Sequence, residues 1–185
     1  AMTRRSSFRC LLVAPGHEYN HFLKEQVVLI FDEAEDGSGD AKGVILENLT
    51  TFTVNEMVPG FDVFDTNVMF MGGEDGGKSV VMIHAQADLK GARSIGGGLY
   101  VGGVAAAKVA VAEKRLEPEA FKFFFNHVRW SGSDLRGMLV EGGWKAVSLS
   151  SKETPVAALH NSESGLWERL RFRLRQKTQE DTPSA

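Results

Sequence analysis

The apolar residues of this chain fall into short runs separated by glycine and polar residues. Runs of this kind that are rich in β-branched and aromatic residues and bounded by turn formers are typical of β-strands. The segment 33–40, which is acidic and rich in glycine and serine, is typical of a mobile hairpin loop. The pattern predicts strands at residues 9–13, 26–31, 43–46, 67–71, 79–84, 121–125 and 144–149.

Helical periodicity is concentrated in the second half of the chain. The alanine-rich segment 104–115 has apolar residues at helical spacing and is bracketed by glycine and proline. Ser133 is expected to cap a helix over residues 134–140, and a last helix is expected over about residues 164–177. Strands with interspersed helices, and without regular βαβ alternation, predict an α+β fold.

Composition sets limits on the function. The 185 residues fit one domain, and 43% apolar with 24% charged residues is a balance that can bury a core. The formal net charge of −3 gives no overall positive field that would attract nucleic acid or anionic lipid. Cys10 is the one cysteine of the sequence, so an intramolecular disulfide and a cysteine-based zinc cage are excluded within this chain. Because it lies in an apolar strand, we interpret it as a small buried hydrophobe.

We expect one domain over residues 9–177, between a disordered N-terminal segment 1–8 and a disordered tail 178–185. The N-terminal residues lack the apolar region of a secretory signal. No apolar run approaches the roughly 18 residues that a membrane crossing requires. We therefore expect no membrane partner.

The segment His17-Glu18-Tyr19-Asn20-His21 matches the H-E-x-x-H motif of zinc hydrolases. On a helix, this spacing places two imidazoles one turn apart for zinc, with the glutamate as general base. Pro15-Gly16 precedes the motif and a predicted strand follows it, which suits a loop at least as well as a helix. A third ligand is also needed, and no spacing singles out His84, His127 or His160 for that role.

The segment from Gly72 to Ser79, GGEDGGKS, matches the phosphate-binding pattern G-x-x-x-x-G-K-[ST]. A working loop of this kind follows a strand and opens a helix whose N-terminal amides bind phosphate. Here the next residues are β-branched and apolar, which predicts a second strand and a hairpin turn between the two. Glu74 and Asp75 would also repel phosphates. We interpret the segment as a glycine-rich turn, with nucleotide binding as an alternative.

Two other groupings are weaker. Ser131, Ser133, His127 and Asp134 can be drawn as a catalytic triad, but no G-x-S-x-G elbow is present and helix capping explains the serines. We interpret the basic residues of the last helix as the solvated flanks of an amphipathic helix, with binding of nucleic acid or of an acidic partner as the alternative. These basic residues are Arg169, Arg171, Arg173, Arg175 and Lys177.

The order of motifs along nearly the whole chain resembles the YqgE/AlgH family. The most specific part is FKFFFNHVRW at residues 121–130, followed by Asp134-Leu135 and Gly143-Trp144. Residues 116–119, LEPE, are similar to the eukaryotic, plastid-associated branch. The other matching segments are LLVAP at 11–15, Phe22, VVLI at 27–30, GVILENL at 43–49, MFMGG at 69–73, GGLYV at 97–101 and LWE at 166–168.

The chain departs from the family pattern at several positions. The family usually has Asn-Arg-Pro at residues 47–49, Gly-Gly-Pro at 72–74 and Gly-Tyr-Ala-Gly-Trp at 126–130, where this chain has ENL, GGE and NHVRW. Its common cysteine after the second strand is Phe31 here, which argues against a redox role. The resemblance therefore implies a divergent member.

The resemblance implies an α+β fold with a mixed, largely antiparallel sheet that is bifurcated, partly barrel-like and flanked by helices. The family is uncharacterised, and the AlgH name implies a link to regulation of transcription. We expect a non-catalytic binding or regulatory module with a surface near Gly72-Gly73 and Trp130. The alternatives are a zinc hydrolase using His17 to His21 and a nucleotide-binding protein using Gly72 to Ser79.

We assign no catalytic, cofactor-binding or metal-binding residue and expect no cofactor. The expected partner is a protein or small molecule of unknown identity, and the net charge does not favour nucleic acid. The expected location is intracellular and soluble, in the cytoplasm or, in a photosynthetic eukaryote, in the chloroplast.

Overall fold

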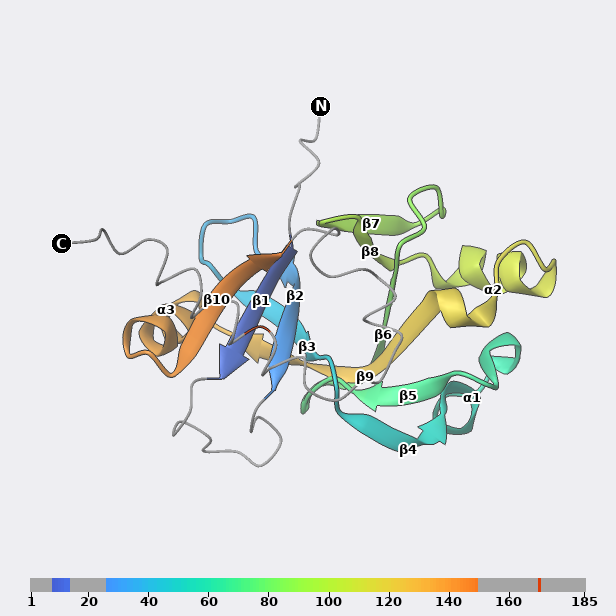
Figure 1. The fold of residues 1–185 in the computed structure, drawn as a ribbon, viewed down its shortest axis with the longest axis horizontal. Helices are drawn as coiled ribbons and strands as arrows, with labels where there is room; N and C mark the ends of the chain where they lie inside the picture. The colour runs from blue at the N-terminus through green and yellow to red at the C-terminus, as the bar shows by residue number, and fades with distance from the viewer. Residues whose placement is uncertain (1–7, 14–25, 150–169, 171–185) are drawn as a thin grey trace.

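The computed structural model describes residues 8–13, 26–149 and 170, and these residues form the elements shown in Figure 1. The helices are α1 (Val54–Met57), α2 (Val104–Ala112) and α3 (Gly132–Val140), with short 3-10 helices η1 (Asp62–Phe64) and η2 (Pro118–Ala120). The strands are β1 (Phe8–Val13), β2 (Val27–Glu33), β3 (Ala41–Ile45), β4 (Leu49–Thr53), β5 (Val68–Met71), β6 (Asp75–His84), β7 (Ala92–Gly96), β8 (Leu99–Gly102), β9 (Phe121–Trp130) and β10 (Trp144–Leu149).

The strands form one sheet that curls into a nearly closed, barrel-like shape. Its order is β10-β1-β2-β3-β9-β6-β8-β7, and β5 joins β4 to the side of β9. Among the described strands, the β5–β9 pairing is parallel and the others are antiparallel. The predicted α+β fold with a largely antiparallel, partly barrel-like sheet is confirmed.

The sheet divides at β9, the long strand that runs through the middle of Figure 1. β5 pairs with the first half of β9 and β3 with its second half, both along the same edge, while β6 pairs with the opposite edge. Gly72 lies at the branch point, where its N–H donates to the Phe125 carbonyl at 2.8 Å and its carbonyl accepts from the Ile45 N–H at 2.9 Å. The bifurcated sheet that the resemblance implied is therefore present.

Both faces of this sheet are covered by apolar side chains, which is why five consecutive residues of β2, residues 27–31, are buried. The inner core lies inside the barrel and consists of Val27, Leu29, Phe31, Val44, Leu46, Val81, Ile83, Ile95, Leu99, Phe124 and Leu170. The aromatic core, around α1, α2 and η1, consists of Val54, Phe61, Phe64, Met69, Met82, Ala107, Val111, Phe121 and Phe123. The third core lies against α3 and consists of Val28, Ile30, Ala41, Ile45, Leu135 and Trp144.

The strands expected from apolar runs are confirmed, with differences at their ends. β9 continues to Trp130 instead of ending at residue 125, and β6 starts at Asp75 instead of residue 79. Apart from Val128 and Trp130, the extra residues are polar or glycine, so their hydrophobic pattern gives little strand signal, and pairing with neighbouring strands decides that they are strand. β4, β7 and β8 were not expected.

The predicted N-cap of α3 at Ser133 is wrong. The helix begins at Gly132, and Ser131 caps it by accepting a hydrogen bond from the Asp134 N–H at 3.1 Å. Gly132 packs so closely against the backbone of Ser38 that a Cβ would collide with it. Two serines two residues apart made the register ambiguous in the sequence, and this backbone contact decides it.

The predicted hairpin loop 33–40 does connect β2 to β3. The Ala34 N–H donates to the Asp40 carbonyl at 2.8 Å, and the Asp40 carboxylate accepts from the Gly132 N–H at 2.8 Å. The loop end is therefore tied to the start of α3, and the mobility of the loop stays a prediction.

Other predictions fall on residues outside the described part. Of the predicted last helix 164–177, Leu170 alone is described, and it is helical and buried in the inner core. The domain limits at residues 8 and 177 also stay predictions. No described helix is long and apolar enough to cross a membrane.

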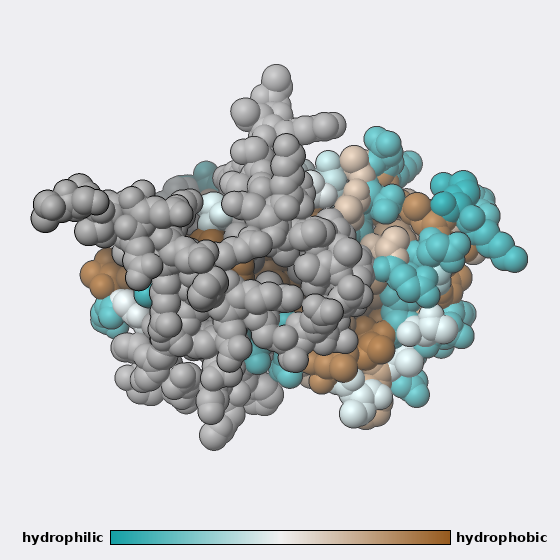
Figure 2. Space-filling view, viewed as in Figure 1, coloured by the Kyte–Doolittle hydropathy of each residue, from teal (hydrophilic) through white to brown (hydrophobic). Residues whose placement is uncertain are grey.

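The ribbon formed by β4 and β5 carries exposed hydrophobic side chains. Leu49, Phe52 and Val68 are each exposed, and Figure 2 shows a hydrophobic surface over this ribbon. The Phe52 N–H bonds to the Thr50 hydroxyl and the Thr53 N–H to the Glu56 carboxylate. These bonds within the chain occupy backbone donors that would otherwise invite strand pairing.

Candidate functional site

The link between β5 and β6 crosses directly over β9. The two strands lie on opposite edges of β9, and only three residues separate them. A Cβ at Gly72 would collide with the carbonyl oxygen of Asn126, and a Cβ at Gly73 would collide with the carbonyl group of His127. Two backbones therefore pass in direct contact, which requires glycine. The link joins two strands as predicted, but the predicted hairpin is wrong because β5 and β6 do not pair with each other.

β6 then begins with a wide bulge. Its residues 76–79 oppose Asn126 alone on β9. Lys78 and Asn126 both have left-handed backbones, with φ of 71° and 60°. The Lys78 N–H donates to the side-chain oxygen of Asn126 at 2.8 Å. Non-glycine residues seldom adopt this conformation, and bulges gather next to functional sites.

Ser79, the last residue of this bulge, faces His127. Ser79 Oγ lies 3.4 Å from His127 Nδ1. A Cβ at Gly76 would collide with the side chains of both residues, and Gly76 has φ of 106°. Its surroundings and its conformation therefore both require glycine. On another side, the His127 ring meets Phe31 edge-on with ring centroids 5.9 Å apart.

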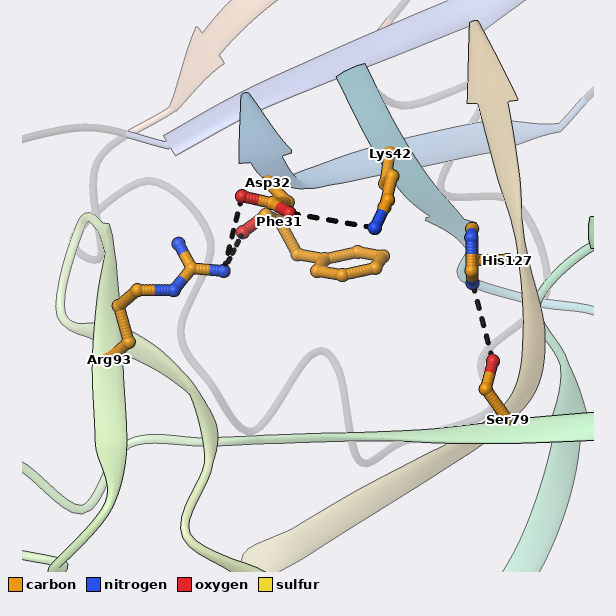
Figure 3. A network of polar contacts seen from close by, with 6 residues as sticks. All are labelled: Phe31, Asp32, Lys42, Ser79, Arg93 and His127. Atoms are coloured by element: carbon orange, nitrogen blue, oxygen red, sulfur yellow. Dashed lines mark hydrogen bonds and ion pairs between the residues drawn. The ribbon is translucent and has the colours of Figure 1, made fainter. Parts of the chain in front are cut away.

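Phe31 is the bulged residue of β2. The register between β2 and β3 shifts between Ile30 and Asp32, so Phe31 has no partner on β3. Its carbonyl accepts a hydrogen bond from Arg93 Nη2 at 3.0 Å. Arg93 comes from β7, which pairs with β8 at the edge of the described sheet. Its side chain thus bridges the opening of the barrel between β7 and β2 (Figure 3).

The Asp32 carboxylate lies between two cations. Its Oδ1 is 3.6 Å from Arg93 Nη2 and its Oδ2 is 3.9 Å from Lys42 Nζ. The side chains of Arg93, Lys42 and Asp32 are 51%, 42% and 41% exposed. Ion pairs this long and this exposed contribute little to stability. These charged groups are therefore accessible to a ligand.

Burial lowers the pKa of His127, and the nearby Lys42 ammonium lowers it further. Arg129 acts in the same direction, whereas Asp75 and Asp32 raise the pKa. The imidazole is therefore neutral at pH 7, with one ring nitrogen as donor and the other as acceptor.

We call the group Phe31, Asp32, Lys42, Ser79, Arg93 and His127 the crossing site (Figure 3). It combines two cations, one carboxylate, a hydroxyl, a neutral imidazole and the edge of an aromatic ring. Among the described residues, no carboxylate hydrogen-bonds to His127, so the Ser79–His127 pair lacks the group that orients histidine in a triad. The triad drawn from Ser131 and Asp134 does not form either, because Ser131 caps α3.

Residues 72–79 do not form a phosphate-binding loop. Ser79 lies inside β6 and opens no helix, so the amide cluster and dipole that hold phosphates are missing at this place. Glu74 and Asp75 are exposed beside the bulge. The geometry argues against nucleotide binding by this motif.

The H-E-x-x-H segment from His17 to His21 lies outside the described residues. Within the described residues, no group of three histidine, cysteine or acidic side chains is placed to hold a metal ion. The zinc hydrolase alternative stays a prediction. Stoichiometric zinc in untagged protein that is lost in a His17→Ala variant would support it.

Lys122 is a chemically unusual residue that the sequence did not reveal. It is 8% exposed on β9, its Nζ donates to the Leu46 carbonyl at 3.1 Å, and the ammonium lies 4.1 Å from the centroid of the Phe70 ring. Burial lowers its pKa to about 8, although the Glu47 carboxylate acts in the opposite direction. A single lysine in an aromatic run gives no sequence signal of such burial, because the signal depends on which strand lies opposite.

The expected surface near Gly72-Gly73 and Trp130 needs a correction. Both glycines are buried, and Trp130 is half-buried against Trp144, with ring centroids 5.6 Å apart. The accessible groups of this region belong to the crossing site. No hydrophobic pattern would have brought them together, because they come from five different strands.

The fold defines a class of mostly antiparallel, nearly closed barrel-like α+β proteins with few helices. The chain is similar to the solution structure of the AlgH protein from Pseudomonas aeruginosa, with a TM-score of 0.64 and 14% identity over 100% of this chain and 97% of that chain. It is also similar to the crystal structure of protein DIP2367 from Corynebacterium diphtheriae, with a TM-score of 0.62 and 19% identity over 84% and 81% of the two chains.

The sequence comparisons identify the family. The profile described as AlgH-like matches residues 10–178, so the chain belongs to the AlgH-like family. A UPF0301 protein from Bacteroides thetaiotaomicron is 26% identical over 152 residues, which cover 82% of this chain and 74% of the relative. A UPF0301 protein from Bacteroides fragilis is 24% identical over 158 residues, which cover 85% and 77%. The family is uncharacterised, and the predicted family membership is confirmed.

Proposed function

We propose that this protein is a non-catalytic binding module and that the crossing site is its binding surface. One observation carries the proposal: irregularities in three separate strands meet there, namely the bulge at Phe31, the bulge at residues 76–79 and the left-handed Asn126. Each is less stable than regular pairing, and such deviations gather at functional sites. The charged groups around them are accessible.

The chemistry of the site favours binding over catalysis. The Ser79–His127 contact is long, at 3.4 Å, and lacks an orienting carboxylate among the described residues. The lowered pKa makes His127 a weaker base than an ordinary histidine. The same groups are well suited to hold a polar ligand.

We further propose that any regulatory role acts through a small molecule or a protein instead of direct binding to DNA. The formal net charge is −3, and no described helix forms a basic face suited to the major groove. Weak, sequence-independent retention of duplex DNA at physiological salt is the expected result of a mobility-shift assay. Tight and sequence-dependent retention would contradict this part of the proposal.

The main experiment is an NMR screen of the full chain against a library of small polar molecules. Backbone amide shifts are expected to cluster at the crossing site, and a His127→Ala variant is expected to reduce them. Lys108→Ala, a substitution on the distant α2, is the matched control and should leave them unchanged. Ligands that cluster at another surface would contradict the location. Turnover on a broad panel of hydrolase substrates that Ser79→Ala abolishes would contradict the non-catalytic role.

A further inference from the structure

We propose that the crossing site binds an oxyanion, the carboxylate or phosphate group of a small ligand, between Arg93 and Lys42 in exchange for Asp32. The inference rests on the proposed binding function and adds the chemical class of the ligand. It starts from the arrangement in Figure 3, where Arg93 and Lys42 approach the Asp32 carboxylate from different strands.

Counting described residues alone, the two cations have unused hydrogen-bonding capacity. Lys42 Nζ is 3.9 Å from its carboxylate partner, which is beyond hydrogen-bond distance. Arg93 uses Nη2 for the Phe31 carbonyl, and no other group of the guanidinium bonds to a described residue. A guanidinium offers five donors in a planar fork that matches carboxylate and phosphate oxygens. An incoming oxyanion therefore finds donors that Asp32 leaves open.

Neutral donors lie on the opposite side of the same space. Figure 3 shows Ser79 and His127 across from Arg93, with the Phe31 ring between them. The Ser79 hydroxyl and the neutral His127 imidazole can each donate one hydrogen bond. Neither brings a negative charge to the site.

The surrounding charges favour an anion. Lys42, Arg93 and Arg129 carry positive charge around the site, and Asp32 and Asp75 carry negative charge. The carboxylate of Asp75 is already bonded to the Arg129 backbone N–H at 3.0 Å. When Asp32 is displaced, Lys42 and Arg93 attract an anionic ligand in preference to a cationic one.

The test is a titration of the full chain with inorganic phosphate and, separately, acetate, followed by the imidazole NMR signal of His127. The assignment comes from a His127→Gln variant. Bound anion partly cancels the effect of Lys42, so we expect the pKa of His127 to rise on binding. Sodium chloride at equal ionic strength is the screening control.

Substitutions of Lys42, Arg93 and Asp32 test whether these residues bind the anion or only stabilise the fold. Lys42→Gln and Arg93→Gln are each expected to weaken binding about two- to fivefold. Asp32→Asn removes the competing carboxylate at nearly constant shape, so it is expected to tighten binding about two- to fivefold. Arg115→Gln is the matched control, since this exposed arginine pairs with Glu113 far along the chain, and it should change nothing.

The phosphate and acetate titrations can support the proposal or overturn it. Tighter binding of phosphate than acetate would assign a phosphate ligand, and the reverse would assign a carboxylate. A shift of the His127 pKa in sodium chloride as large as the shift in phosphate or acetate would overturn the proposal. Binding by Asp32→Asn that is no tighter than binding by the wild type would also overturn it. Neutral or cationic molecules that bind at the crossing site in the library screen would overturn the anionic class and leave the binding function standing. Lys42→Gln keeps the test valid if Arg93→Gln proves unstable, because Lys42 makes no bridge to β7.

Discussion

The two halves of β9 differ in almost every physical property, although they form one continuous strand. Residues 121–125 pair with β6 on one edge, residues 123–125 also pair with β5 on the other, and the aromatic side chains fill two of the cores. Residues 126–130 include a left-handed residue, face a bulge, and carry partly exposed polar side chains. The first half fills two cores with aromatic rings, and the second half contributes His127 to the crossing site.

Firm packing of the first half of β9 explains why the irregular second half is tolerated. Phe123 is fully buried, with its ring 4.8 Å from Phe64 and 5.9 Å from Phe61. A strand anchored so firmly at one end can support a strained crossing at the other. A function at the crossing therefore depends on packing in the aromatic core.

Breaking the packed half should have the largest effect. We expect Phe123→Ala to lower the free energy of unfolding by about 3–5 kcal/mol, because it leaves a cavity among aromatic rings. His127→Ala, four residues along the strand, should cost about 1 kcal/mol or less. Chemical denaturation of both variants measures the difference. Similar losses would contradict the division of β9 into two halves.

The buried lysine tests whether the packed half tolerates charge. The unfolded chain holds the Lys122 proton up to about pH 10.5, whereas the folded chain releases it near pH 8. Stability should therefore rise with pH across this window, by on the order of 3 kcal/mol. Lys122→Met should be more stable than wild type at pH 7, and this gain should shrink toward pH 10.5. Denaturation at several pH values measures it.

Lys108→Met is the control for Lys122, since Lys108 also lies over an aromatic ring, that of Phe61, at 4.1 Å, but is only partly buried. A gain for Lys122→Met that does not change with pH would show that burial of charge is not its cause.

The crossing itself is tested by adding one methyl group. Gly73→Ala should lower the free energy of unfolding by about 1–3 kcal/mol, because the Cβ collides with the backbone of β9. Gly77→Ala meets no atom within 4 Å and differs only in its φ of 57°, so it should cost about 1 kcal/mol. Equal losses in thermal unfolding would show that the collision of the Cβ with β9 is not what requires glycine at position 73.

Relief of backbone strain should give the smallest effect. Lys78→Gly keeps the N–H bond to Asn126 and removes the penalty of a left-handed lysine, so we expect a gain of less than about 1 kcal/mol. Glu74→Gly is the control at a position without positive φ, and its free energy of unfolding should fall by less than about 1 kcal/mol. A loss in both variants would indicate that the bulge is not strained.

Much of the fold could be predicted from local pattern. The apolar runs located most of the strands, and the alanine-rich segment located α2. The strand that follows the glycine-rich segment 72–79 could also be predicted, because the residues after Ser79 are β-branched and apolar. The second half of β9 could not be predicted, since residues such as Asn126, His127 and Arg129 have no strand pattern and become a strand only by pairing with β3 and β6.

The α+β class, the family and the positions where glycine gathers follow from the sequence, because they depend on local periodicity and on motif order. Tertiary structure alone decided that Gly72 and Gly73 pass over β9, that Lys122 is buried, and that six residues from five strands form the crossing site. The physical reason is that contacts between distant segments follow from strand order and register. Neither property is encoded in any short stretch of sequence.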